Sequence, residues 1–144
     1  MPTLSETAMI GLSMRFAVVV DGVDLGGWAS CTGLSVNFNL TERKEGGVND
    51  RTVWLPNRIT YPKITLTRAM TATDSAKVTK WLASMVDKDS GGTAKITLFD
   101  AHHQEVASWS LQNVLPSLWK GPTLNATSHE VAIETLELAH EGFL

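Results

Sequence analysis

Histidine is the residue type in this sequence most able to bind a metal ion. His102 and His103 are adjacent, so their side chains would point to opposite faces of a strand, and no cysteine lies near them. His129 and His140 lie too far apart to match the zinc-binding helix motif, in which two histidines are four positions apart. We therefore expect no metal site and interpret His102 and His103 as turn residues.

The segment Ser30-Cys31-Thr32-Gly33 brings hydroxyl and thiol groups together before a glycine. It lacks the frame of a strained nucleophile turn, and Cys31 is the only cysteine, so no intrachain disulfide can form. We interpret Cys31 as a small core residue and the segment as a bend entering a strand. Asp21 and Asp24 are not followed by an oxygen-rich loop, and no phosphate-binding glycine motif occurs. The sequence thus predicts no catalytic residues and no cofactor.

Five tryptophans could provide flat surfaces for stacking on sugars. Trp81 falls on an apolar helix face and Trp109 alternates with polar neighbours, so both are expected in the core. Trp54 and Trp119 lie near expected loops. They keep open the alternative of a monomeric β-sandwich module that binds a glycan or a peptide.

Length and composition indicate one globular domain over residues 1–144, with residues 1–13 as an N-terminal arm. The chain has 144 residues, of which 43% are hydrophobic and 19% are charged, and its net charge is −3. This charge gives no reason to expect nucleic-acid binding by the whole surface. We expect neither a signal peptide nor a membrane anchor, because the apolar stretch 16–20 is too short for either; assembly in the cytoplasm follows.

The elements that would carry these residues are mostly strands. A two-residue period or β-branched composition predicts strands at 14–21, 34–41, 52–55, 63–68, 94–99 and 106–111, with Asp21-Gly22 as a turn. Pro56-Asn57 is expected to end one strand, and 116–122 is expected to be a loop. The segment 130–138 also fits a helix, but its β-branched residues favour a strand.

One helix is predicted over 74–87. Thr73 or Asp74 would cap it, and its apolar face consists of Val78, Trp81, Leu82, Met85 and Val86. Together with the strands, this helix gives a mainly β (α+β) fold: an antiparallel β-sandwich or barrel with one packed α-helix.

The strand at 34–41 has the clearest alternation. One face is apolar, which predicts burial, and the other is polar and would stay hydrated or meet a partner. Residues 42–51 follow as a long, exposed hairpin or loop. The apolar face consists of Leu34, Val36, Phe38 and Leu40, and the polar face of Ser35, Asn37, Asn39 and Thr41.

Many short motifs in order resemble the phage tail tube family, which includes the inner tube proteins of contractile injection systems. The resemblance spans residues 14–144. Its main segments are Phe16 to Gly22, Cys31 to Leu34, Glu45 to Asn49, Leu55 to Asn57, Tyr61 to Arg68, Trp81, Trp119 to Asn125, and Glu130 to Leu138.

The resemblance implies a tail-tube-like fold whose subunits form six-fold rings stacked into a hollow tube. Sheath, baseplate and cap proteins would be partners, and protein effectors or DNA would pass through the lumen. Ser35, Asn37, Asn39 and Thr41 become candidates for lining this lumen. The implied subunit or ring interface comprises Glu42, Arg43, Lys44, Glu45, Gly46, Gly47, Val48 and Asn49.

The sequence departs from the family at Thr32, where a serine is usual, and in the turn Asp100 to Gln104, which lacks a glycine. These departures leave open a second role with the same fold, that of a tube-initiating baseplate relative.

Overall fold

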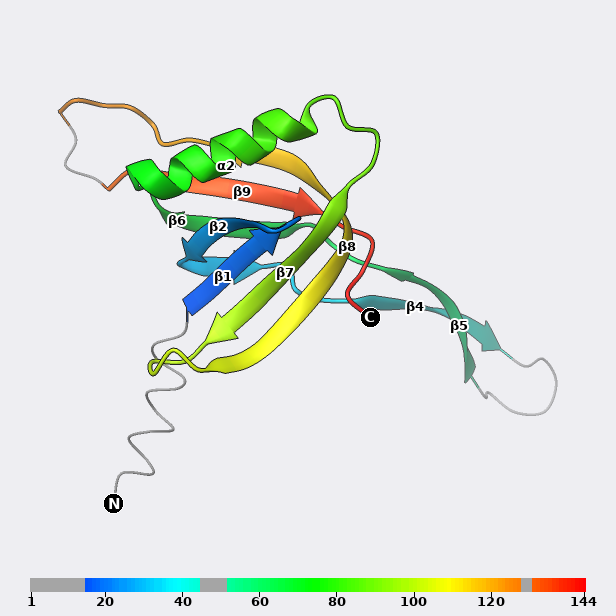
Figure 1. Ribbon diagram of the computed structural model, residues 1–144. Helices are drawn as coiled ribbons and strands as arrows, with labels where there is room; N and C mark the ends of the chain where they lie inside the picture. The colour runs from blue at the N-terminus through cyan, green and yellow to red at the C-terminus, as the bar shows by residue number, and fades with distance from the viewer. Residues whose placement is uncertain (1–14, 45–51, 128–130) are drawn as a thin grey trace, which may run out of the picture.

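The computed structural model describes residues 15–44, 52–127 and 131–144. These residues form nine strands and one helix, in agreement with the predicted mainly β antiparallel fold (Figure 1). The elements are β1 (Arg15–Val20), β2 (Val23–Trp28), β3 (Ser30–Thr32), β4 (Asn37–Lys44), β5 (Thr52–Thr60), β6 (Ile64–Ala69), α2 (Ala72–Met85), β7 (Gly92–Phe99), β8 (Glu105–Lys120) and β9 (Ile133–Ala139).

Seven strands form one sheet that curls into a barrel, in the order β2-β1-β7-β8-β9-β6-β3. The long β8 joins the two halves, because its first part pairs with β7 and its last part with β9. On the other side, β2 passes into β3 through Ala29 alone, and the amide of Ala29 donates a hydrogen bond of 2.9 Å to the carbonyl of Thr67 in β6. The chain therefore crosses between the halves at two places.

The barrel encloses an apolar core built from alternate residues of its strands, as period-two burial requires. The helix α2 packs against β2 and β8 and adds Val78, Trp81 and Met85 to this core. Full burial of each large apolar side chain stabilises the fold by about 1.5–3 kcal/mol. The fully buried strand residues include Val18, Val20, Leu25, Ile64, Leu66, Ile96, Leu136 and Leu138.

The ends of α2 differ from those predicted. Thr71 is the N-cap, and its side chain accepts a hydrogen bond of 3.3 Å from the amide of Asp74, so neither Thr73 nor Asp74 is the cap. Val86 is the C-cap and is 77% exposed, so the apolar face of the helix ends at Met85.

Two prolines lie inside strands, although the sequence predicted a strand end at Pro56 and a loop at Pro116. Pro56 lies within β5, which pairs with β4 alone among the described strands. A missing amide donor therefore costs no ladder bond on the open edge of β5. Pro116 lies within β8, at a shift of register between Pro116 and Leu118 where the strand turns towards β9. The turn Asp21-Gly22 is confirmed, with both residues at positive φ, and 133–139 is a strand.

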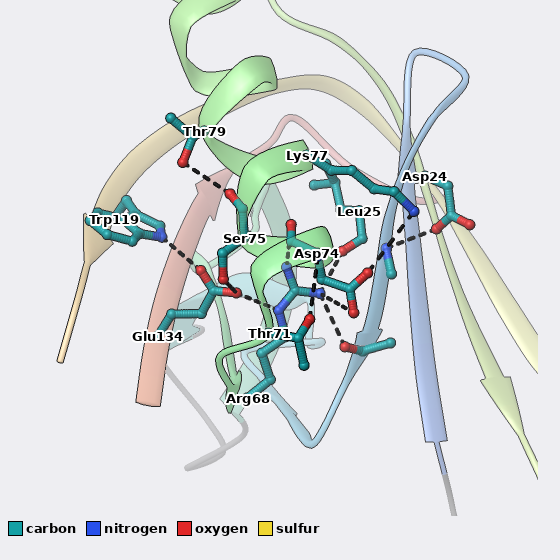
Figure 2. A network of polar contacts seen from close by, with 12 residues as sticks. Asp24, Leu25, Arg68, Thr71, Asp74, Ser75, Lys77, Thr79, Trp119 and Glu134 are labelled. Carbon is teal, nitrogen blue, oxygen red and sulfur yellow. Dashed lines mark hydrogen bonds and ion pairs between the residues drawn. The ribbon is translucent and has the colours of Figure 1, made fainter. Parts of the chain in front are cut away.

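A buried ion pair connects the barrel to the helix (Figure 2). Nε of Arg68 donates to Oε1 of Glu134 at 2.5 Å, and both side chains are at least 96% buried. Nη1 of Arg68 donates to the carbonyls of Leu25 at 2.5 Å and Gly27 at 3.2 Å, both in β2. Nη2 donates to the carbonyl of Asp74 in α2 at 3.1 Å. One guanidinium thus joins β6, β9, β2 and α2.

Glu134 is bonded on its other sides as well. Its Oε1 accepts from the hydroxyl of Ser75 at 3.2 Å, and its Oε2 accepts from Nε1 of Trp119 at 3.1 Å. The guanidinium of Arg68 also stacks on Trp28, with 3.9 Å between Cζ and the ring centroid. Because every oxygen of Glu134 has a partner, both charges are accommodated in the core.

Among the described residues, no helix is long and apolar enough to cross a membrane.

Replacing Glu134 by glutamine should destabilise the fold strongly. The substitution keeps the shape but removes the buried counter-ion of Arg68 and leaves it only the longer ion pair with Asp74, whose Oδ2 lies 4.0 Å from Nη1. Removing one partner of a buried ion pair typically costs about 3–5 kcal/mol. Urea unfolding followed by circular dichroism would measure this loss. Glu137→Gln on the same strand is the matched control, since its ion pair with Lys63 spans 3.6 Å between more exposed side chains and should be worth less than about 1 kcal/mol. Equal effects of the two substitutions would contradict this account of the pair.

Stability should also fall in mild acid because of His140, whose ring lies 5.3 Å from that of Tyr61. Burial lowers the pKa of His140 from its usual value near 6.5, and the backbone at Pro62 partly opposes this. The unfolded chain binds the proton first, so the contribution is complete above about pH 6.5 and is lost as the pH falls through the lowered pKa. Urea unfolding at about pH 7.5 and about pH 5 should show a smaller loss for His140→Gln than for the native chain. His102→Gln, in an exposed turn, should behave like the native chain. An unchanged pH dependence in His140→Gln would show that another group is responsible.

Candidate assembly surfaces

The β4–β5 hairpin projects from the barrel and has no core of its own (Figure 1). Every residue of β4 is exposed, and in β5 only Val53 is half-buried. The prediction of a strand at 34–41 is correct from Asn37 onwards, and the predicted hairpin after it is confirmed by the antiparallel pairing of β4 and β5. The predicted burial of its apolar face is wrong, because Leu34 and Val36 are only half-buried and Phe38 and Leu40 are exposed.

One face of the hairpin is apolar. Directly opposite residues of an antiparallel pair share a face, so Phe38 with Ile59 and Leu40 with Pro56 lie on the same side. Trp54 follows on this side, opposite Glu42. We call Phe38, Leu40, Trp54, Pro56 and Ile59 the hairpin apolar face. Phe38 and Trp54 are each 59% exposed. Contiguous apolar surface of this kind on a soluble chain is typical of a binding site.

The other face of the hairpin carries the polar residues of β4, with Val53 and Leu55 of β5 opposite Arg43 and Thr41, and side-chain hydrogen bonds on this face join the two strands. Asn39 donates from Nδ2 to the carbonyl of Arg58 at 3.0 Å, and Asn57 donates from Nδ2 to the hydroxyl of Thr41 at 3.3 Å. These bonds flank the register shift between Phe38 and Leu40, where β5 carries one extra residue. Ser35, Asn37, Asn39 and Thr41, predicted to line a lumen, are all exposed, and the lumen assignment stays a prediction.

The predicted interface segment is only partly described. Glu42, Arg43 and Lys44 are exposed at the far end of β4. The other predicted residues lie outside the described residues: Glu45, Gly46, Gly47, Val48 and Asn49. The hydroxyl of Thr52, the first described residue of β5, donates to Oε1 of Glu42 in β4 at 3.4 Å, so this end of the hairpin has a polar contact across the strands.

A second surface lies where β8 and β9 diverge. Segments 120–125 and 131–135 enclose a hollow of about 390 Å³, which we call the β8–β9 hollow. Its apolar lining comes from Pro122, Leu124, Val131 and Ile133, and Lys120 adds a positive charge. Leu124 and Val131 are 89% and 68% exposed, so this apolar lining is also uncovered.

The buried ion pair fixes the edge of this hollow. Trp119 precedes it in β8, and its indole is held by Glu134. A Cβ on Gly121 would lie 3.0 Å from Cη2 of Trp119, so glycine lets the chain pass close over the ring. Trp119 is therefore positioned by bonds on the inside and by the backbone on the outside.

Sequence reasoning missed the hollow because it interpreted 116–122 as a loop and could not pair it with 131–135. The available signal was the Trp119-Lys120-Gly121-Pro122 motif, which entered only as part of a resemblance.

The residues considered for chemistry occupy structural positions. Trp81 is buried and Trp109 packs against the core, as predicted. Cys31 also packs against the core, and burial raises the pKa of its thiol to about 11, so the thiol is protonated and weakly nucleophilic at neutral pH. The carboxylate of Asp100 accepts from the amides of His102 and Gln104, which shows that this histidine pair lies in a turn. Across the residues that the structure describes, no three histidine, cysteine or acidic side chains group together as metal ligands would.

Known structures share this fold. A chain from the cryo-EM structure of the anti-feeding prophage (AFP) baseplate, 6-fold symmetrised, is 22% identical with a TM-score of 0.71, over 90% of this chain and 89% of that chain. A chain from an extracellular contractile injection system, the PVC sheath–tube complex in the extended state, is 20% identical with a TM-score of 0.72, over 89% and 85%. A chain from the AFP tube-terminating cap is 24% identical with a TM-score of 0.69, over 86% and 82%.

Curated protein sequences give no significant match. The family model described as T4-like virus tail tube protein gp19 matches residues 12–144, a range that contains the barrel, the hairpin and the β8–β9 hollow. The chain therefore belongs to the T4-like virus tail tube protein family, and it is a structural component of a tube.

Proposed function

We propose that this chain is the inner-tube subunit of a contractile injection system or a contractile phage tail. It assembles into six-fold rings that stack into a hollow tube, and cargo passes through the lumen. Its family membership supports a role in a tube, and its structural relatives come from sheath–tube, baseplate and cap assemblies. Its role is mechanical rather than catalytic.

The hairpin apolar face is the observation that carries this proposal. Its side chains lie on a hairpin that projects from the barrel, and each of them is exposed. In water, exposed aromatic and aliphatic groups are costly, and covering one of them in an interface gains about 1.5–3 kcal/mol. A subunit that repeats around a ring and along a tube provides this cover from its own copies.

The remaining parts of the proposal concern partners and cargo. Sheath, baseplate and cap proteins contact the tube, and the particle is built in the cytoplasm. The chain acts as one tail-tube domain. Protein effectors or DNA are the cargo. The lumen candidates Ser35, Asn37, Asn39 and Thr41 carry no formal charge, so they would hold neither kind of cargo strongly.

A tube-initiating baseplate protein is a second candidate function with the same fold. It is favoured by the similarity to a chain from the AFP baseplate. The two roles differ in self-assembly, because an initiator forms a single ring whereas a tube subunit stacks its rings into rods.

Polar substitution on the hairpin should abolish assembly at concentrations where the native chain assembles. Negative-stain electron microscopy and light scattering over a concentration series should show rings or hollow rods for the native chain. Phe38→Ser removes one anchor of the hairpin apolar face, so its half-assembly concentration should rise about tenfold or more, which corresponds to about 1.4 kcal/mol.

Val86→Ser is the matched control, since it removes an apolar side chain that is even more exposed but lies at the C-cap of α2, away from the hairpin. It should assemble like the native chain. A native chain that stays monomeric at every concentration would contradict the proposal. It would favour the glycan- or peptide-binding module, with Trp54 as the candidate contact.

A further inference from the structure

We propose that Tyr61, His140 and Phe143 form a clamp that fixes the direction of the β4–β5 hairpin and opens when His140 takes up a proton. We call these three residues the aromatic clamp. Near neutral pH the hairpin is then presented in one direction, and in mild acid it is not. The inference goes beyond the proposed function, because it concerns the single chain before any assembly.

The direction of the hairpin depends on its root. Among the described strands, β4 and β5 pair only with each other, so the sheet of the barrel does not hold them. The root is the pair of Asn37 and Thr60, at which β4 begins and β5 ends. The connecting segments 33–36 and 61–63 lie between this pair and the barrel. Their contacts therefore set how the hairpin projects.

Backbone contact holds one side of the root. Gly33 has a φ of +92°, and a Cβ on it would lie 2.1 Å from the carbonyl oxygen of Lys63, so glycine lets the two connecting segments touch. Leu34, which follows Gly33, packs against the core. Neither of these contacts depends on pH.

The aromatic clamp holds the other side of the root. Tyr61 directly follows β5, and its ring centroid lies 5.3 Å from those of both His140 and Phe143. Phe143 in turn packs against the core. In Figure 1 the chain after β9 runs to the root of the hairpin, in agreement with these contacts. Segment 140–143 thus connects the hairpin to the core.

This segment is held against β8 by backbone hydrogen bonds. The amide of Gln112 donates to the carbonyl of Gly142 at 2.9 Å, and the amide of Glu141 donates to the carbonyl of Gln112 at 2.8 Å. Gly142 is buried, and a Cβ on it would lie 2.9 Å from Cε2 of Tyr61. Because the backbone passes so close to this ring, movement of the segment would release Tyr61.

His140 is the part of the clamp that responds to pH. Its Nδ1 accepts a hydrogen bond of 3.1 Å from the amide of Gly142. Its Nε2 is buried and has no hydrogen-bond partner among the described residues. The neutral ring therefore carries its proton on Nε2. A second proton on Nδ1 would make two donors face each other and would charge a ring that has no acceptor nearby, so protonation opposes the closed clamp.

The ionisable groups around His140 do not offset this effect. They are Tyr61, Lys63, Glu137 and Glu141, and β8 contributes the uncharged Gln112. Lys63 and Glu137 pair with each other at 3.6 Å, and Glu141 is exposed. Burial lowers the pKa of His140, and only the backbone at Pro62 opposes this. The clamp is therefore closed above about pH 6.5 and opens as the pH falls through the lowered pKa.

Hydrogen exchange followed by mass spectrometry tests the opening. After correction for intrinsic rates, protection in peptides containing Gln112 and Gly142 should fall between about pH 7.5 and about pH 5. The fall can reach about thirtyfold, the limit for one proton on a group that titrates near pH 6.5 when the clamp is open. His140→Asn keeps an acceptor for Gly142 without titrating and should show no fall, whereas His102→Gln should behave like the native chain. Unchanged protection in the native chain, or an equal fall in His140→Asn, would overturn the inference.

A pair of spin labels tests the direction of the hairpin. In the chain with Cys31→Ala, labels on Arg43→Cys in β4 and Ser108→Cys in β8 are measured by electron–electron double resonance, with the fold checked by circular dichroism. A single narrow distance distribution at about pH 7.5 should broaden at about pH 5. Adding Tyr61→Ser should broaden it at both pH values, and adding His140→Asn should keep it narrow at both.

A narrow distribution for the native clamp in acid, or for Tyr61→Ser at either pH, would overturn the inference. Both measurements use the chain below its assembly concentration. Their outcome is therefore independent of whether the proposed function holds.

Discussion

The closure of the barrel depends on the buried charge of Arg68. The strands β2 and β6 approach each other at the seam, but they are not neighbours in the hydrogen-bonded order of the sheet. The guanidinium provides what a ladder would provide elsewhere, because it donates to two carbonyls of β2 while it remains part of β6. A planar, permanently charged fork with several donors suits this position, whereas lysine would offer a single point of charge.

Glu134 compensates the buried charge of Arg68 and connects the ion pair to the end of β8. It neutralises Arg68 in the core, and through Trp119 it also determines where β8 ends and the β8–β9 hollow begins. A surface feature is thus fixed by an interaction at the centre of the molecule. Loss of the ion pair would therefore disturb the seam, the helix and the outer edge of β8 together.

Local patterns predicted most of the strands, the helix and the Asp21-Gly22 turn, because these depend on residues close in sequence. Both predicted ends of the helix differ from the observed ends by one to three positions: the N-cap is Thr71, and the helix ends before Val86. The N-terminal end depends on which side chain reaches the first free amides, and local patterns do not determine this. The predictions at Pro56 and Pro116 were wrong because a proline interrupts a strand only where a neighbouring strand would accept a hydrogen bond from its amide. The sequence does not show which neighbour that is.

The assembly surfaces were harder to predict for a different reason. The alternation along β4 correctly predicted an apolar face. Periodicity does not show whether such a face is buried by the same chain or by another chain. The hollow required the pairing of β8 with β9, and Arg68 and Glu134 are 66 positions apart, so neither could be deduced from local spacing.

The exposed apolar face of the hairpin has a thermal consequence. Its removal from water lowers the heat capacity of the system, and near room temperature the gain is mostly entropic. An interface built on Phe38, Leu40 and Trp54 therefore weakens on cooling, whereas contacts dominated by hydrogen bonds would strengthen. Chilled subunits would remain apart for longer, and warming would favour their polymerisation.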